Sequence, residues 1–249
     1  MLPKAIDHGG LFLAWVGSDL AGITNFEPCI DGAGWLSMGR TDPIYRRQGV
    51  AIFLQQQIYA HARRERMNGL RLWASSTNTA SIRACEKVGF RRVCEAAALS
   101  TIIRRRLKRK CLYKPQDSAP RALIDSALKS KYLVKMNGYV GRKWHIIKFD
   151  TKVLTKLESN DELYVIDEAV FLITKPEKRF RHPQSSLTIL DGPVAKSLRE
   201  AKEIAGRLGA RILSSYIPYD RYQISVAKRL GYRRNPWGKH CYVFEKTVP

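Results

Sequence analysis

Two segments in different halves of the chain share short motifs in the same order, and this internal similarity constrains the fold more than any other feature. Gly69-Leu70-Arg71-Leu72 is similar to Gly209-Ala210-Arg211-Ile212. Lys87-Val88-Gly89-Phe90-Arg91-Arg92 follows the first motif, and Arg229-Leu230-Gly231-Tyr232-Arg233-Arg234 follows the second at nearly the same spacing. We therefore expect two copies of one domain, the second more diverged. A single mixed α/β domain with a coincidental similarity is the alternative.

The chain has 249 residues and 45% of them are hydrophobic, which is enough for a core. At about 150 residues per domain, this length fits one large or two modest domains. No segment approaches the ~20 apolar residues of a membrane span, and the first residues lack the apolar stretch of a signal peptide. The five cysteines form no CxxC pair and the histidines have no ligand spacing, so no disulfide framework or metal site is predicted. We expect a soluble cytoplasmic protein.

The charge balance is strongly basic, because 44 Lys and Arg residues against 22 Asp and Glu give a formal net charge of +22. Residues 1–115 and 116–249 share this surplus equally. One run, Arg104–Lys110, is almost entirely cationic. A field of this sign attracts nucleic acid, an anionic membrane surface or a phosphate-bearing cofactor, and composition alone does not choose among them.

Apolar periodicity gives a coarse secondary structure. In the first half it predicts strands at 11–16, 20–27, 34–41, 70–74 and 93–103, and helices at 51–67 and 79–87. Lys114–Pro120, which contains two prolines, is the predicted linker. In the second half it predicts a helix at 121–130, strands at 132–136, 143–149, 162–166, 169–174 and 186–190, and a helix at 195–208. The predicted domains are residues 1–115 and 116–249.

The segment between the third strand and the first long helix has the properties of an anion site. Its backbone N–H groups include unpaired donors of the helix N-terminus, and the helix dipole adds positive potential there. Gly49 allows a phosphate to approach the backbone closely, and Arg46 and Arg47 add charged donors. A pyrophosphate suits this arrangement better than a lone carboxylate. The segment consists of Arg46, Arg47, Gln48, Gly49, Val50 and Ala51.

This loop, followed by Asn78-Thr79-Ala80-Ser81-Ile82-Arg83-Ala84-Cys85-Glu86-Lys87-Val88-Gly89-Phe90, resembles the GNAT superfamily of acyl-CoA-dependent N-acetyltransferases. The family's Arg/Gln-x-x-Gly-x-Gly/Ala loop and its Asn-x-x-Ala-x-x-x-Tyr-Glu-Lys-x-Gly-Phe run match in order and spacing. The resemblance covers about residues 35–92. It implies an α/β (α+β) fold of two GNAT-like domains, each with a mixed, mostly antiparallel twisted sheet and flanking helices.

The resemblance also implies a reaction and a site. The family holds acetyl-CoA in a V-shaped opening between two parallel strands, and a substrate amine attacks the thioester directly. The backbone of Gly39, Arg40 and Thr41 would then contact the pantetheine arm. The loop Arg46–Ala51 would hold the pyrophosphate, and Asn78 would lie near the far end of the cofactor. The partners implied are acetyl-CoA and an acceptor that bears a primary amine.

The first copy departs from the family at Cys85, at Ser81 (where the family usually has Ala) and at its start, and it offers one candidate base. Cys85 stands where a tyrosine often serves as the acid; a thiol can protonate the leaving thiolate in principle, and a small buried cysteine is the alternative. Glu27, at the end of the second strand, is the candidate base, or else an exposed strand-end carboxylate. The copy also begins late, since the family carries a strand and helices before this hairpin.

The second copy lacks the cofactor loop. After its strand at 186–190 it reads Asp191-Gly192-Pro193-Val194-Ala195-Lys196. Asp191 would repel a phosphate and Pro193 removes a backbone donor. We expect this copy to be non-catalytic. The alternative for the whole chain is a non-catalytic GNAT-like scaffold that binds nucleic acid through its basic surface.

Overall fold

The computed structural model describes residues 10–103, 121–178, 182–234 and 240–249. The basic run Arg104–Lys110 and the predicted linker Lys114–Pro120 lie outside the described residues. The fold is a mixed α/β arrangement with a mostly antiparallel sheet and flanking helices, which confirms the predicted class.

The chain divides into two compact units: unit 1 comprises residues 1–93 and 242–249, and unit 2 comprises residues 94–241. This division differs from the predicted domains 1–115 and 116–249. The strand that ends the first half contributes mostly to unit 2, and the last strand of the chain contributes to unit 1. The linker composition could not reveal this exchange, because strand pairing brings together segments that are distant in the chain.

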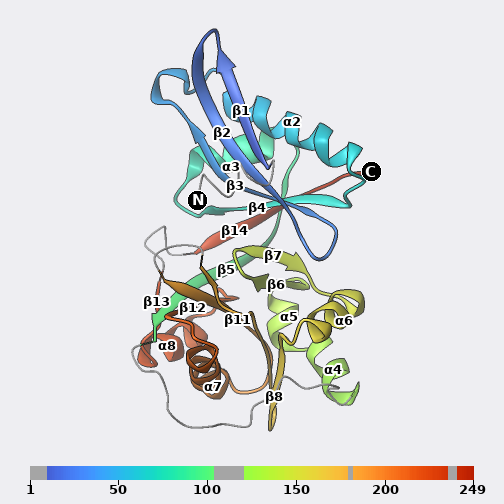
Figure 1. The fold of residues 1–249 in the computed structure, drawn as a ribbon, viewed down its shortest axis with the longest axis vertical. Helices are drawn as coiled ribbons and strands as arrows, with labels where there is room; N and C mark the ends of the chain where they lie inside the picture. The colour runs from blue at the N-terminus through green and yellow to red at the C-terminus, as the bar shows by residue number, and fades with distance from the viewer. Residues whose placement is uncertain (1–9, 104–120, 179–181, 235–239) are drawn as a thin grey trace. The chain divides into compact units, whose positions relative to one another are not determined.

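Unit 1 consists of a sheet in the order β1-β2-β3-β4-β14 with the helices α2 and α3 (Figure 1). β2 pairs antiparallel with β1 and β3, whereas β3 and β4 are parallel. The predicted strands and helices of this unit agree with the structure within about three residues, whereas η1 and β14 were not predicted. The elements of the unit are β1 (Leu11–Val16), β2 (Asp19–Pro28), β3 (Gly34–Thr41), the short 3₁₀ helix η1 (Pro43–Tyr45), α2 (Val50–Arg64), β4 (Gly69–Ser75), α3 (Thr79–Lys87) and β14 (Cys241–Thr247).

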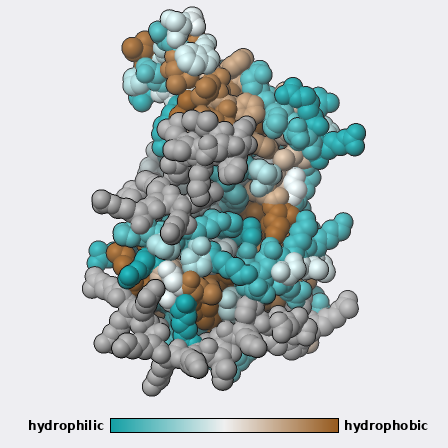
Figure 2. Space-filling model, in the orientation of Figure 1, coloured by the Kyte–Doolittle hydropathy of each residue, from teal (hydrophilic) through white to brown (hydrophobic). Residues whose placement is uncertain are grey.

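The hairpin β1–β2 positions the first turn of α2. Ala14 and Ala21 face α2 and form a buried cluster with Val50 and Leu54. The helix and its buried side chains therefore start at Val50, one residue before the predicted helix at 51–67. The outward side of the same hairpin is apolar and exposed: Leu13, Trp15, Val16 and Leu20 are 43–58% accessible. Brown atoms gather over this hairpin in the upper part of Figure 2.

The last strand is tied into unit 1 by buried charge. Arg71 of β4 is 2% exposed and donates to Asp31 and, at 2.7 Å, to Glu245 of β14. Lys246 Nζ donates to the carbonyl of Val88 at the end of α3 (2.8 Å) and lies 3.9 Å from the centre of the Tyr59 ring of α2. A buried arginine requires such partners, so these contacts specify where β14 inserts.

Unit 2 contains a sheet in the order β5-β12-β11-β9-β8 with helices on both faces. β12 is antiparallel to β5 and parallel to β11. Its elements are β5 (Arg91–Ile102, from residue 94), α4 (Arg121–Leu128), α5 (Lys131–Lys135), β6 (Tyr139–Arg142), β7 (His145–Lys148), α6 (Thr151–Ser159), β8 (Leu163–Ile166), β9 (Ala169–Ile173), β10 (Glu177–Lys178), β11 (Pro183–Asp191), α7 (Val194–Arg207), β12 (Ile212–Pro218), α8 (Arg221–Arg229) and β13 (Arg233–Arg234).

Alternation along β11 assigns the two faces of this sheet. Leu187 and Ile189 belong to the core cluster that contains the buried side chains of α7 and α8. The intervening residues face the β6–β7 hairpin. Ser186 accepts a hydrogen bond from the Lys143 amide, and Thr188 donates one to the Gly141 carbonyl. Both faces are therefore covered.

The prediction of a strand at 132–136 is wrong, because these residues lie largely in the helix α5. The Ser130 side chain accepts a hydrogen bond from the Leu133 amide and acts as the N-cap, a signal that the apolar run Tyr132–Val134 obscured. The predicted strand at 143–149 is only the second half of the hairpin β6–β7. The helix α6 was not predicted, although Asp150 caps it through the Val153 amide.

The internal similarity is real in part. Gly89 and Gly231 are equivalent, because each follows the C-cap of a helix with a positive φ (+88° and +84°) and precedes a buried aromatic residue. Gly69 and Gly209 are not equivalent, since Gly69 begins β4 whereas Gly209 ends α7. The residue of unit 1 that matches Gly209 is Arg66, which adopts φ +53° after the end of α2.

Candidate functional site

The strands β3 and β4 form an opening in unit 1. They pair in parallel only at Gly34–Leu70 and Trp35–Arg71. Beyond that point β3 continues to Thr41 and β4 to Ser75 without further pairing between them. Backbone groups on the facing sides of these segments are then available to a ligand that lies between the strands.

A bulge in β3 lies beside this opening. Asn25 of β2 pairs with Ser37, whereas Ile23 pairs with Arg40, so Met38 and Gly39 together oppose one residue of β2. Met38 adopts φ +58°, which is unfavourable for a side chain other than glycine. Such a bulge redirects backbone groups away from the neighbouring strand. Gly39, predicted as a cofactor contact, has open space where a Cβ would be.

The connection from β3 to α2 spans eight residues, 42–49, and is pinned by its own hydrogen bonds. The Asp42 carboxylate caps η1 by accepting from the Ile44 amide (2.9 Å), and the Gln48 side chain donates to the Ile44 carbonyl (2.9 Å). The Tyr45 hydroxyl donates to Asp19 at 2.6 Å, and this hydrogen bond raises the pKa of Tyr45. The loop is therefore held in one conformation although its side chains are mostly exposed.

The start of α2 is open. Gly49 is the N-cap, with φ +87°. It has no side chain that could accept hydrogen bonds from the first amide groups of the helix. A Cβ built on Gly49 would meet nothing within 4 Å. Arg46 and Arg47 are exposed, and neither forms an ion pair with a described residue. The predicted anion-binding residues Arg46–Ala51 thus lie together at a helix N-terminus that a phosphate can reach.

Asn78 has a clear local role. Its side-chain oxygen accepts from the Ser81 amide at 3.1 Å and caps α3. The residue is exposed, and its contact with a cofactor stays a prediction.

Cys85 lies in the core of unit 1, fully buried with Ile58, Ala62 and Leu70. The Gln55 side chain donates to its sulfur at 3.7 Å. Burial raises the pKa of the thiol to about 11, so the group is protonated at neutral pH. Its position within the core is the one expected for a packing cysteine.

Glu27 is half-buried at the end of β2 and is oriented by a neighbour. The Asn25 side chain, 3% exposed, donates to Glu27 Oε1 at 2.8 Å and to Ser37 Oγ at 3.3 Å. Alternation and register place Asn25, Glu27 and Ser37 on the sheet face opposite the core cluster of Phe26 and Leu36. Asn25 and Ser37 were missed in the sequence, because only the bulged register of β2 and β3 brings them together.

The corresponding place in unit 2 is closed. Only Gly192 and Pro193 separate β11 from α7. Tyr132 of α5 donates its hydroxyl hydrogen to the Gly192 carbonyl at 2.7 Å, directly before the first turn of α7. A Cβ on Gly192 would lie 2.4 Å from the carbonyl oxygen of Glu168. Asp191 accepts from Ser126 of α4 at 2.7 Å. The backbone between β8 and β9 therefore occupies the place beside Gly192 that is open beside Gly49.

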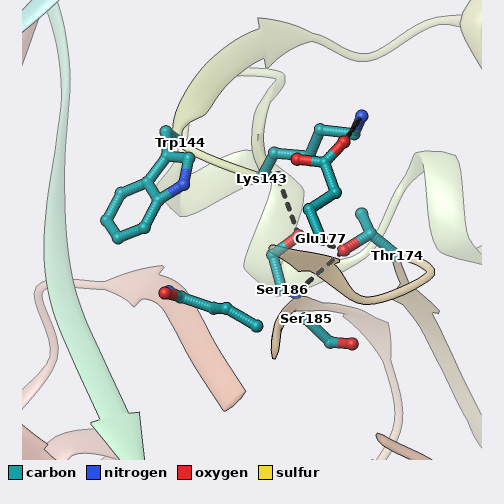
Figure 3. A pocket seen from close by; sticks show the side chains of 7 residues that line it. Lys143, Trp144, Thr174, Glu177, Ser185 and Ser186 are labelled. Atoms are coloured by element: carbon teal, nitrogen blue, oxygen red, sulfur yellow. Dashed lines mark hydrogen bonds and ion pairs between the residues drawn. The ribbon is translucent and has the colours of Figure 1, made fainter. Parts of the chain in front are cut away.

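A small cavity in unit 2 lies between the β6–β7 turn and the start of β11 (Figure 3). Lys143 and Trp144 line one side, and Thr174, Ser185 and Ser186 line the other. Lys143 pairs with Glu177 across the opening. The cavity holds about 10 Å³, which is room for one water molecule and not for a substrate.

Two further features bear on the site. Among the described residues, no group of three or more His, Cys, Asp or Glu side chains could hold a metal ion. Likewise, no helix in the described part of the chain is long and apolar enough to cross a membrane.

Residues 3–90 match the model of the Acetyltransferase (GNAT) family. The whole fold is similar to two structures provisionally assigned as acetyltransferases. One, from Thermoplasma acidophilum, has 16% identity, TM-score 0.59 and coverage of 99% of this chain and 81% of its own. The other, from Pyrococcus horikoshii, has 14% identity and TM-score 0.53, with coverage of 100% of this chain and 77% of its own.

A GCN5-related N-acetyltransferase from Sphaerobacter thermophilus has 13% identity and TM-score 0.52, with coverage of 92% of this chain and 78% of its own. A comparison with curated proteins found no match. At these identities the structures show a shared fold. The family match shows that residues 3–90 form a GNAT acetyltransferase domain, as the motifs implied. The match places an acetyltransferase domain in this part of the chain.

Proposed function

We propose that unit 1 transfers the acetyl group of acetyl-CoA to a primary amine of an acceptor. The observation that carries this proposal is the open N-terminus of α2 beside the diverging strands β3 and β4. A pyrophosphate fits there, because unpaired helix amides, the dipole and two unpaired arginines converge on a place where Gly49 leaves room.

The remaining binding residues follow from this placement. The backbone of Gly39, Arg40 and Thr41 contacts the pantetheine arm next to the β3 bulge. Arg46, Arg47 and the amides from Gln48 to Ala51 hold the pyrophosphate. Asn78 lies by the cofactor while its oxygen caps α3. The thioester supplies an activated acetyl group, and the chain supplies proximity and orientation.

For proton transfer we assign Glu27 as the group that accepts the proton of the attacking amine. Its carboxylate is oriented by Asn25, which pairs with Ser37 beside the bulge and also donates to the Ser37 hydroxyl. A positioned carboxylate of this kind contributes typically about 10²–10⁴-fold. Cys85, the predicted acid, we assign to packing instead, because its thiol is enclosed by the core.

Unit 2, we infer, is a diverged GNAT-like copy without acetyl-CoA binding. The order of β11, α7, β12 and α8 repeats that of β3, α2, β4 and α3, with a parallel strand pair in each case. Its anion site is lost because Tyr132 and Glu168 fill the space at the start of α7.

The test is calorimetry of the full chain with acetyl-CoA, followed by release of the free CoA thiol in the presence of mixed primary amines. We expect saturable binding at one site per chain and at least a 100-fold weaker Kd for Gly49→Glu, with transfer lost in parallel. Gly17→Glu is the matched control, since Gly17 also has a positive φ and open space around it. Absence of saturable binding, the result expected of a non-catalytic scaffold, would sink the proposal, as would equal effects of both variants.

A further inference from the structure

The distal end of the α2–α3 layer in unit 1 carries cations that the acetyl-CoA site does not use. α2 has no acidic residue, and its last turn and the residues after it expose Arg63, Arg64 and Arg66. With about 1.5 Å of rise per residue, this end lies roughly 20 Å from the open N-terminus of the same helix. The arginines therefore form a cationic surface that is separate from the proposed acetyl-CoA site.

Lys246 joins the ends of the two helices into one surface. Its ammonium group contacts the ring of Tyr59, one turn before Arg63, and the carbonyl of Val88, next to Lys87. Arg83 is exposed one turn before Lys87. We call this surface the basic end; it comprises Arg63, Arg64, Arg66, Arg83, Lys87 and Lys246, with Glu65 and Glu86 as its carboxylates. Arg63, Arg64 and Arg66 form no ion pair with any described residue.

Arg66 shows that local stability does not explain these cations. A cation in the last turn of a helix stabilises the helix dipole, which accounts for Arg63 and Arg64. Arg66, however, adopts φ +53° directly after the C-cap of α2, where α3, α7 and α8 have a glycine and α5 and α6 have Asn137 and Asp161. An arginine in this conformation costs about 1–2 kcal/mol relative to glycine. The backbone conformation therefore does not account for an arginine at this position.

We propose that the basic end binds the phosphate backbone of a nucleic acid, independently of acetyl transfer. The charge is complementary, and arginine donates in pairs to phosphate oxygens. A membrane is the less suitable partner, because the exposed large hydrophobic residues of unit 1 lie on the β1–β2 hairpin, at Ile44 and at Phe53, and none lies in the basic end.

Fluorescence anisotropy of the full chain with fluorescein-labelled 20-nucleotide RNA, and with DNA of the same sequence, tests the proposal. We expect Arg63→Glu/Arg64→Glu to weaken binding at least tenfold at 100 mM salt. The slope of the logarithm of the binding constant against the logarithm of salt concentration should become shallower by about two. Lys228→Glu/Arg229→Glu is the matched control, because these are the exposed last-turn cations of α8 in unit 2. It should weaken binding less than twofold.

Arg66→Gly separates binding from folding, since it removes a cation and relieves the backbone. We expect a higher melting temperature together with weaker binding. Saturating acetyl-CoA should leave the anisotropy unchanged. The proposal is overturned if both double variants weaken binding equally, if acetyl-CoA displaces the RNA, if polyglutamate competes as well as unlabelled RNA, or if wild type does not bind at 50 mM salt.

Discussion

The N-termini of α2 and α7 occupy equivalent places in units 1 and 2, and they differ in what surrounds them. In unit 1 an eight-residue loop leads to Gly49, which has no neighbour in reach of a Cβ. In unit 2 the connection is only Gly192 and Pro193, and Tyr132 and the Glu168 carbonyl contact it. The same strand–helix junction is therefore open around its glycine in one unit and in contact with neighbouring elements in the other.

The difference teaches that a helix N-terminus becomes an anion site only if nothing else satisfies its amides. Every helix has unpaired donors and a dipole at this end. In unit 2 the Tyr132 hydroxyl bonds to the Gly192 carbonyl directly before α7, and the Glu168 carbonyl occupies the place where a Cβ of Gly192 would lie. The start of α2 in unit 1 has no such internal contacts, which is why we propose it as the anion site.

The largest expected contrast comes from placing the same side chain at the two junctions. Gly49→Ala should cost about 1–2 kcal/mol of unfolding free energy, because only the positive φ opposes it. Gly192→Ala should cost about 1–3 kcal/mol more, since its Cβ would also collide with the Glu168 backbone. Urea denaturation of both variants measures this. Equal losses would contradict the distinction between an open and a filled junction.

Tyr132→Phe removes the hydroxyl at the start of α7 while keeping the ring. The Gly192 carbonyl loses its partner, so we expect a loss of about 1–3 kcal/mol in urea denaturation. The Kd and stoichiometry for acetyl-CoA, measured by calorimetry, should not change. A second acetyl-CoA per chain in this variant would show that unit 2 retains a competent site.

The smallest effects concern the arginines of the open junction. Arg46→Gln and Arg47→Gln each remove one charged donor from an exposed site, and we expect about a five-fold rise in the Kd for acetyl-CoA per variant. The effect should shrink with added salt, because exposed charges are screened. Arg199→Gln on α7, also an exposed arginine, serves as the control and should leave the Kd unchanged.

The sequence predicted local features well where the signals are local. The apolar spacing of α2 and the Gly-Phe and Gly-Tyr helix ends specified elements that the structure contains. Prediction failed at α5, where an apolar run concealed the Ser130 cap. It also failed to see the exchange of β5 and β14, because pairing across more than 100 residues leaves no trace in periodicity.

By itself the sequence determined the family match of residues 3–90, the residues of the proposed anion-binding loop and the basic character of the chain. These depend on residue types at short spacing, which the chain carries wherever it folds. Only the tertiary structure decided that the loop in unit 1 is open, that Tyr132 closes its counterpart, and that Asn25 orients Glu27. The physical reason is that access and orientation depend on which distant side chains fill the neighbouring space.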